Sequence, residues 1–147
     1  QKKTCIKNVS FGKNVTIVTP SNIYGCEIGD DTFIGPFVEI QENVKIGSKV
    51  KIQSHSFICS LVEIKNNVFI GHGVMFINDK FTGGGPAMGV KSKWKNTKIG
   101  NNVSIGSNST ILPVKIIDNV VIGAGSVVVK DINEKGVYAG NPAKKIR

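Results

Sequence analysis

The chain contains only two histidines, His55 and His72, and both lie in the same part of the sequence as Asn78 and Asp79. Histidine and carboxylate side chains are the usual proton carriers in catalysis, and an amide can hold a reacting group in place. Each residue also has a purely structural interpretation. The histidines could be corner residues bonded to backbone, Asn78 a turn former and Asp79 a loop cap. Their shared location favours a functional site.

The elements that must position these residues follow from a six-residue repeat. Isoleucine recurs at every sixth position from Ile28 to Ile70, and the repeat resumes between Ile99 and Val128. A small or branched residue follows four positions after nearly every one of them. A period of six fits neither a helix face nor a hairpin, and it is typical of a coil with flat sides. We therefore expect an all-β fold, a parallel β-helix of about five to six triangular coils.

The repeat is interrupted in three places. Near Gly25 and near Pro113 the step shortens to five residues, which we interpret as one-residue deletions at a corner. The third interruption is an inserted loop, expected at residues 78–98, that contains three consecutive glycines and the only tryptophan, Trp94. Because a long loop inside a compact repeat is usually functional, this loop marks the expected site. The chain should form one domain over residues 1–147, with a short tail at 133–147 that leaves the coil.

Composition excludes several classes. The net charge is +9, but Arg147 is the only arginine and aromatic residues make up 7%. Nucleic-acid readers depend on arginine forks and aromatic stacking, so no nucleic-acid partner is expected. No apolar run is long enough to span a bilayer, so no membrane insertion is expected. Three cysteines without a CxxC pair, and no signal pattern at residues 1–3, predict a cytoplasmic location.

Beyond the repeat, four stretches carry a more specific resemblance: residues 22–29, 35–41, 53–59 and 71–79. Together with the Gly-Asn-Pro-Ala-Lys close at residues 140–144, they resemble hexapeptide-repeat acyltransferases. Within that group they are similar to the bacterial nucleotide-sugar N-acetyltransferases. The resemblance implies a left-handed β-helix and a homotrimer with active sites between subunits. It also implies acetyl-CoA as the donor and a UDP- or dTDP-linked 3-amino sugar as the acceptor, in the synthesis of surface lipopolysaccharide.

The resemblance implies that Asn78 contacts the reacting end of the acceptor. We expect Asp79 or His72 to orient the amine or take its proton, so these three residues form the expected catalytic group. Substrate contacts are expected from His55, Gln53, Phe76 and Trp94. Coenzyme contacts are expected from Ser107 and Ala124 to the pantetheine, from Lys130 and Lys144 to phosphates, and from Pro142 to the adenine. No metal is expected.

Three alternatives remain open at this point. An O-acetyltransferase of the same fold would typically carry a histidine base in the loop, whereas residues 79–98 contain none. A sugar amine with a pKa near 8 is already partly neutral and needs less help, which favours N-acetylation. A γ-type carbonic anhydrase needs three histidine ligands, which two histidines per chain could supply only across subunits. A non-catalytic ice-binding solenoid would need a regular face of threonines and no loop.

Overall fold

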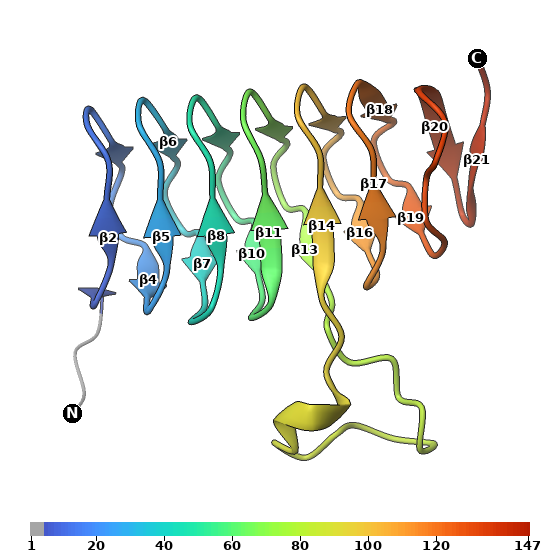
Figure 1. Ribbon diagram of the computed structural model, residues 1–147, viewed down its shortest axis with the longest axis horizontal. Helices are drawn as coiled ribbons and strands as arrows, with labels where there is room; N and C mark the ends of the chain where they lie inside the picture. The colour runs from blue at the N-terminus through green and yellow to red at the C-terminus, as the bar shows by residue number, and fades with distance from the viewer. Residues whose placement is uncertain (1–4) are drawn as a thin grey trace.

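The computed structural model describes residues 5–147, so residues 1–3, on which the expected absence of a signal sequence depends, lie outside the described residues. The described chain winds into a three-sided coil whose axis runs horizontally in Figure 1. Short strands stack in parallel register along each side. We name the three sides sheet A, sheet B and sheet C.

The strands follow each other around the coil in the repeating order A, B, C. Sheet A comprises β1 (Ile6–Lys7), β4 (Asn22–Tyr24), β7 (Glu39–Ile40), β10 (Phe57–Ile58), β13 (Met75–Phe76), β16 (Thr110–Ile111) and β19 (Val127–Val128). Sheet B comprises β2 (Ser10–Phe11), β5 (Glu27–Ile28), β8 (Lys45–Ile46), β11 (Val62–Ile64), β14 (Thr97–Ile99) and β17 (Lys115–Ile116). Sheet C comprises β3 (Thr16–Ile17), β6 (Phe33–Ile34), β9 (Lys51–Ile52), β12 (Phe69–Ile70), β15 (Ser104–Ile105), β18 (Val120–Ile122), β20 (Gly136–Gly140) and β21 (Ala143–Lys145).

The predicted core is confirmed at every repeat position. The isoleucines at the repeat positions from Ile28 to Ile70 and from Ile99 to Ile122 are at most 4% exposed, as is Val128. The second residue of each hexad is buried as well, including polar Ser56 and Thr32, whose hydroxyls donate to carbonyls of the next coil. Each fully buried isoleucine contributes about 1.5–3 kcal/mol of burial free energy. Stacked aliphatic side chains therefore replace the aromatic residues that the chain largely lacks.

The glycine that follows many inward isoleucines is required by close packing between coils. A Cβ on Gly29 would lie 2.6 Å from a backbone carbon of Gly47, and one on Gly47 would lie 2.7 Å from the backbone carbon of Lys65. The positive φ of the corner falls two residues later, at positions such as Lys49 with φ 55°. Glycine is therefore required at this position because a side chain would clash with the next coil, and not because the position needs a positive φ.

The expected count of five to six coils is wrong, because the described chain makes about seven turns. The first turn begins earlier than expected, at β1, because Ile6 lies five residues before Phe11 instead of six and both side chains are exposed. The last turn lies partly in the tail, where Ile132 bridges Ile116 and β20 pairs in parallel with β18. The tail therefore continues sheet C, and only β21 turns back antiparallel.

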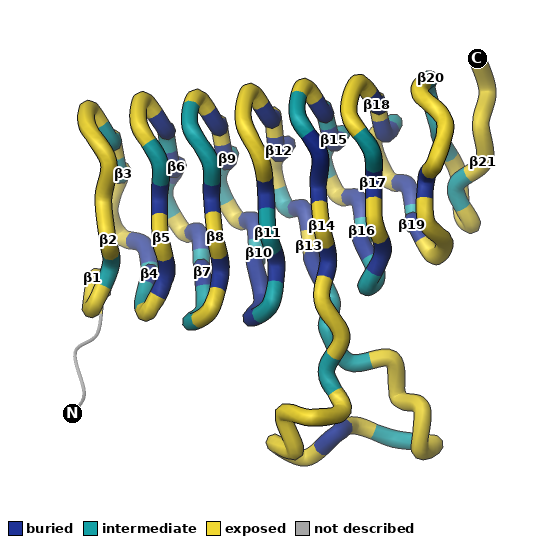
Figure 2. The backbone as a smooth tube through the Cα atoms, viewed as in Figure 1, coloured by how far each residue is buried: buried dark blue, intermediate teal, exposed yellow. Residues whose placement is uncertain are grey.

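Between β13 and β14 the chain leaves the coil as the expected loop, visible below the coil in Figure 1. Strand β14 begins at Thr97, so the last two residues of the expected segment, Thr97 and Lys98, are strand rather than loop. The loop contains one 3₁₀ turn, η1 (Lys91–Lys93). Figure 2 shows that the loop is mostly exposed, whereas buried residues recur on every turn of the coil.

Candidate active site

The loop departs from the corner that joins sheet A to sheet B. The two shortened steps of the repeat fall at this same corner, between Ile23 and Ile28 and between Ile111 and Ile116. Cys26 and Val114 are each 4% exposed there, and each fills the inward position that a hexad would give to its second residue. The two deletions are therefore absorbed without loss of the core. This corner, named here the A–B corner, is the place where the coil tolerates a change of length.

Backbone and side-chain contacts of Asp79 and Asn78 hold the loop at its base. The Lys95 N–H donates to the Asn78 carbonyl at 2.8 Å, which closes the neck of the loop. The Asp79 carboxylate accepts the N–H of Phe81 at 3.0 Å through Oδ1 and that of Ala87 at 2.6 Å through Oδ2. Both carboxylate oxygens are thus committed to the loop backbone, so the loop-cap interpretation of Asp79 accounts for its position.

A second tether joins the loop to an earlier coil. The Lys91 ammonium lies 2.8 Å from Oε1 of Glu42, a residue of the A–B corner two coils nearer the N-terminus. Both side chains are about half exposed, at 66% and 46%, so the ion pair contributes little to stability. Its geometric consequence is clear, because it directs the loop back along the coil toward β7 and β8.

Asn78 lies at the mouth of a pocket of about 410 Å³ beneath the loop. Its Nδ2 donates to the Ser60 carbonyl at 3.1 Å, which fixes the side-chain amide and leaves its oxygen without a partner among the described residues. The pocket is lined by Gln41, Phe57, Cys59, Phe76, Ile77, Asn78, Asp79, Phe81 and Trp94. An amide oxygen set in an apolar, aromatic pocket can accept a hydrogen bond from a ligand N–H or O–H group.

The structure therefore brings together four of the predicted residues: Asn78, Asp79, Trp94 and Phe76. Phe76 is only 1% exposed, because it occupies the inward position of its hexad, so it forms the floor of the pocket. Five residues of the lining were not predicted as site residues: Gln41, Phe57, Cys59, Ile77 and Phe81. Gln41 and Cys59 lie 36 and 18 residues before Ile77, so the coil length of 18 could have placed both in this column.

Cys59 is not available as a nucleophile. Burial raises the pKa of its thiol to about 12, and its side chain is 2% exposed. Burial likewise raises the pKa of Cys26 to about 11. Because the thiolate is the reactive form of cysteine, both residues act as small core residues.

The two histidines lie at the neighbouring corner, between sheets C and A, on adjacent coils. The His55 ring stacks on Phe37 with centroids 5.0 Å apart and an interplanar angle of 21°. The backbone N–H of His72 donates to Oγ of Ser107 at 3.1 Å. His55, His72 and Gln53 are therefore separated from the Asn78 pocket by the width of sheet A and do not line it.

The residues predicted to hold the coenzyme lie on the C-terminal coils. His72, Ser107 and Ala124 follow one another in a column along the corner between sheets C and A. A Cβ on Gly106 would lie 2.4 Å from the Ala124 nitrogen, so these coils are pressed together, and nothing lies within 4 Å of the Cβ position of Gly125. Beyond His72, this column is thus a narrow strip of small residues with open space beside Gly125.

The remaining predicted coenzyme residues are exposed and lie beyond this strip. Lys130 follows β19 at the A–B corner, and Pro142 precedes β21. Lys144, within β21, forms no ion pair among the described residues, whereas its neighbour Lys145 pairs with Glu134. These positions leave Lys130 and Lys144 free to meet a charged ligand.

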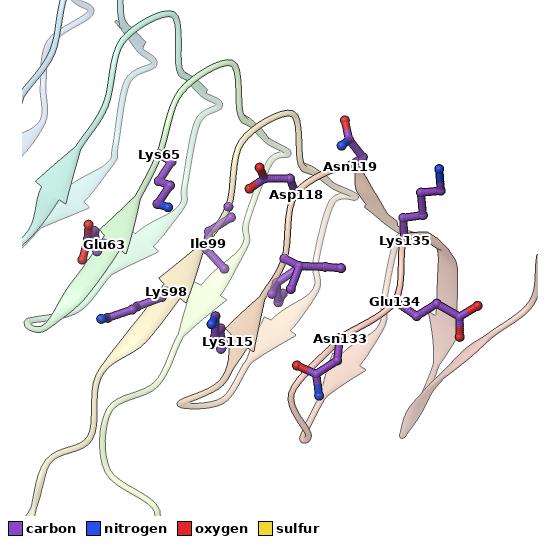
Figure 3. Close-up of a pocket in the computed structure, with 13 residues that line it drawn as sticks. Glu63, Lys65, Lys98, Ile99, Lys115, Asp118, Asn119, Asn133, Glu134 and Lys135 are labelled. Carbon is purple, nitrogen blue, oxygen red and sulfur yellow. The ribbon is translucent and has the colours of Figure 1, made fainter.

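A pocket of about 610 Å³ lies elsewhere, on the outer face of sheet B (Figure 3). Lys98 and Lys115, paired in register, line it together with Glu63 and with residues 133–135 of the tail. None of the predicted site residues lies there. It is an open trough of charged side chains. The predicted catalytic residues lie instead at the two corners that border sheet A.

Two further findings bear on the alternatives. Within residues 5–147, no group of three or more His, Cys, Asp or Glu side chains could hold a metal ion. Of the helical segments in the same range, none is both long and apolar enough to cross a membrane.

Comparison with known protein families agrees with the repeat. Residues 25–60 match the family described as bacterial transferase hexapeptide (six repeats), and residues 96–130 match the hexapeptide repeat of succinyl-transferase. The chain therefore carries the repeats of the hexapeptide transferases, and the predicted resemblance to hexapeptide-repeat acyltransferases is confirmed.

Among curated proteins, the chain is 45% identical over 62 residues to a chloramphenicol acetyltransferase of Klebsiella aerogenes, covering 42% of this chain and 30% of that protein. It is 32% identical over 152 residues to the bifunctional protein GlmU of Streptococcus uberis, covering 98% of this chain and 33% of that protein. The chain thus spans about a quarter to a third of the length of the curated relatives it matches.

Solved structures extend the likeness over the whole coil. A mutant of AntD, an N-acyltransferase from Bacillus cereus in complex with dTDP and coenzyme A, superposes with a TM-score of 0.79. It is 28% identical, and the match covers 94% of this chain and 83% of that one. A hexapeptide transferase family protein from Anaplasma phagocytophilum has a TM-score of 0.77 at 18% identity and shows the fold alone.

Proposed function

We propose that this protein is an acetyl-CoA-dependent N-acetyltransferase that acts on the amino group of a nucleotide-linked sugar. The observation that carries the proposal is the pocket under the loop, where the Asn78 amide faces aromatic side chains and no histidine is present in residues 79–98. The likeness to AntD, an N-acyltransferase bound to dTDP and coenzyme A, supports this choice of donor and acceptor.

The proposed reaction is direct transfer. The neutral amine attacks the thioester carbonyl carbon, the C–S bond breaks, and the coenzyme leaves as a thiolate. The ammonium formed on the sugar gives up one proton, which balances the thiolate to a thiol. Asn78 would hold the amine at attack distance, because its amide oxygen would accept a hydrogen bond from the amine N–H. Backbone N–H groups would stabilise the oxyanion.

This scheme assigns Asp79 a positioning role. Its two oxygens already accept backbone N–H groups of the loop, so the residue braces the loop that covers the amine. His72 lies on the coenzyme side of sheet A, in one column with Ser107 and Ala124. We therefore infer that neither residue is a dedicated base, which an amine acceptor does not require.

Acetyl-CoA would lie along the strip of small residues. Ser107 and Ala124 would face the pantetheine arm, and the open space beside Gly125 fits a thin, extended chain. Lys130 and Lys144 would meet its phosphates as point charges, with Pro142 near the adenine. In this arrangement the donor occupies the C-terminal coils and reaches the acceptor at β13.

We propose further that the protein acts as a homotrimer of left-handed coils with sites between neighbours. The outward positions of sheets A and C include the apolar Phe69 and Met75, 40% and 41% exposed, and Phe37 at the corner between them is 57% exposed. The corresponding row on sheet B is Ser10, Glu27, Lys45, Glu63, Lys98 and Lys115. Sheets A and C would therefore face neighbouring copies. We place the reaction in the cytoplasm, in lipopolysaccharide synthesis.

An O-acetyltransferase is the second candidate, because the chain is 60% identical over 50 residues to galactoside O-acetyltransferase of Escherichia coli, covering 33% of this chain and 25% of that protein. Release of free thiol from acetyl-CoA should be measured with paired UDP- and dTDP-sugars that differ only by an amino or a hydroxyl group at one carbon. We expect turnover with an amino sugar and none with its hydroxyl partner. Turnover of the hydroxyl sugars alone would make the protein an O-acetyltransferase.

A further inference from the structure

The outer face of sheet A changes character along the coil. At β10 and β13 its outward residues are Phe57 and Met75, beside the Asn78 pocket. Toward the N-terminus, on β4 and directly after β7, the same face carries polar side chains. We name Asn22, Tyr24, Glu39 and Gln41 the sheet A polar cluster. None of these four residues has a role in the proposed mechanism.

The cluster is built around the Glu39 carboxylate. Its Oε2 accepts Nδ2 of Asn22 at 3.3 Å, and its Oε1 accepts Nε2 of Gln41 at 3.3 Å. The Gln41 amide is fixed in turn, because its Oε1 accepts the N–H of Ser60 at 3.1 Å. Glu39 is half-buried and forms no ion pair within residues 5–147. A carboxylate has about four acceptor sites, so two remain for a ligand that donates hydrogen bonds.

Open space lies on both sides of the cluster. A pocket of about 410 Å³ is lined by Tyr24 and Glu42, and a second of about 340 Å³ is lined by Glu39 and Phe37, with Asn22 in both. Burial raises the pKa of the Tyr24 phenol, and the charges of Glu39 and Glu42 raise it further, so its ring carries a neutral hydroxyl. The cluster thus presents a flat aromatic ring beside a fixed carboxylate.

The cluster lies on the same face as the Asn78 pocket, at a distance set by strand spacing. Asn22 and Met75 are three strands apart in register, which at about 4.8 Å per strand is roughly 14 Å along the coil. Gln41 belongs to both the cluster and the lining of the pocket. The loop covers part of this distance, since it begins at Asn78 and reaches Glu42, at the level of β7, through Lys91.

We infer that the sheet A polar cluster binds the nucleoside end of the acceptor, with Glu39 accepting hydrogen bonds from ribose hydroxyls or a base N–H and Tyr24 stacking on the base. Carboxylates recognise ribose hydroxyls in this way in dinucleotide sites, and aromatic rings bind bases by stacking. Lys91, held beside Glu42, would supply positive charge for the diphosphate between the nucleoside and the sugar. The inference rests on the proposed function, and it orients the acceptor toward the N-terminal coils and the donor toward the C-terminal coils.

The test is calorimetric binding of UDP, dTDP and GDP to the full chain, independent of acetyl transfer. Glu39→Gln keeps the shape of the side chain and should weaken binding of the preferred nucleotide about tenfold, as should Tyr24→Ala. Tyr24→Phe retains the ring and should bind within about twofold of the unmodified protein. The matched control is Glu27→Gln, a carboxylate at the same level of the coil but on sheet B, which should leave binding unchanged.

The outcomes separate the two proposals. Unchanged binding by Glu39→Gln and Tyr24→Ala, with acetylation of an amino-sugar nucleotide intact, would overturn the nucleoside site and leave the proposed function standing. Acetylation of amino sugars with no binding of any of the three nucleotides would also overturn the nucleoside site. Loss of both nucleotide binding and acetyl transfer in the unmodified protein would overturn both proposals.

Discussion

The corner between sheets B and C and the A–B corner belong to the same coils, yet only the first keeps one length. From Phe11 to Ile17 and on to the step from Ile116 to Ile122, each passage from sheet B to sheet C takes six residues. The passages from sheet A to sheet B take five residues at the first turn and near Gly25 and Pro113, six after β7 and β10, four from Val128 to Ile132, and 23 where the loop is inserted after Phe76.

Hydrogen bonding explains the difference. At the corner between sheets B and C, a backbone N–H of each coil donates to a side-chain oxygen of the next coil, in a ladder formed by Asp30, Ser48, Asn66, Asn101 and Asp118 at 2.7–3.1 Å. The last rung is strong enough that the Asn101 N–H lowers the pKa of Asp118. Most residues of the ladder donate to one neighbouring coil and accept from the other. Adding or removing a residue at such a position would therefore break two hydrogen bonds. Within residues 5–147 the A–B corner has only isolated bonds of this kind, from Ser60 N–H to Gln41 and from Lys115 N–H to Asp131, so it can carry deletions and the loop.

The largest expected effect comes from adding one methyl group to the regular corner. In Gly100→Ala the new Cβ would lie 2.6 Å from the Asp118 nitrogen, so backbone must move, and the free energy of unfolding should fall by about 3 kcal/mol. In the matched loop variant, Gly85→Ala, the new Cβ has no neighbouring atom within 4 Å, so the free energy of unfolding should change by less than about 0.5 kcal/mol. Urea denaturation measures both. Equal losses would contradict the contrast between the corners.

The second effect concerns turnover. Asn78→Ala should lower kcat about 10²-fold, because the amine loses the group that positions it. Its stability should fall by only about 1 kcal/mol, since a single hydrogen bond to Ser60 is removed. Asn96→Ala, an exposed asparagine at the other end of the loop, is the control and should keep kcat within about twofold. A kcat for Asn78→Ala that matches the control would remove Asn78 from the site.

The third effect separates bracing from proton transfer at Asp79. Asp79→Ala removes the acceptor of two loop N–H groups, so the loop should be cut faster by protease and kcat should fall about tenfold. Asp79→Asn keeps one acceptor oxygen, so its kcat should fall less. Its kcat should depend on pH in the same way as that of the unmodified protein. If Asp79→Asn instead loses a limb of that pH profile, Asp79 is a base and the bracing account is wrong.

The smallest effect tests the coenzyme residues. Lys144→Ala should raise the KM for acetyl-CoA roughly threefold and leave kcat unchanged, and the difference should shrink at high salt. The Lys145 ammonium is already paired with Glu134, so Lys145→Ala should change the KM for acetyl-CoA less. An unchanged KM in Lys144→Ala at low salt would reject its contact with phosphate.

The fold could be predicted almost completely from the sequence, because one period determines which residues point inward. Each inward residue from Ile28 to Val128 lies where the period places it. The number of coils was underestimated because the steps from Ile6 to Phe11 and from Val128 to Ile132 are shorter than six residues. The site was predicted only in part. Asn78, Asp79 and Trp94 meet because they belong to one corner and its loop, whereas the contribution of Phe81 depends on how the loop folds back, which no period describes.

The most direct test of the central claim, that chemistry resides at the A–B corner and the coil serves as its scaffold, is a loop replacement. Residues 79–94 would be replaced by Asn-Gly, since Asn78 and Lys95 are already joined by a 2.8 Å hydrogen bond. The variant should unfold at nearly the temperature of the unmodified protein and should release no thiol from acetyl-CoA with any amino-sugar nucleotide that the unmodified protein accepts. Thiol release at the unmodified rate would contradict the account.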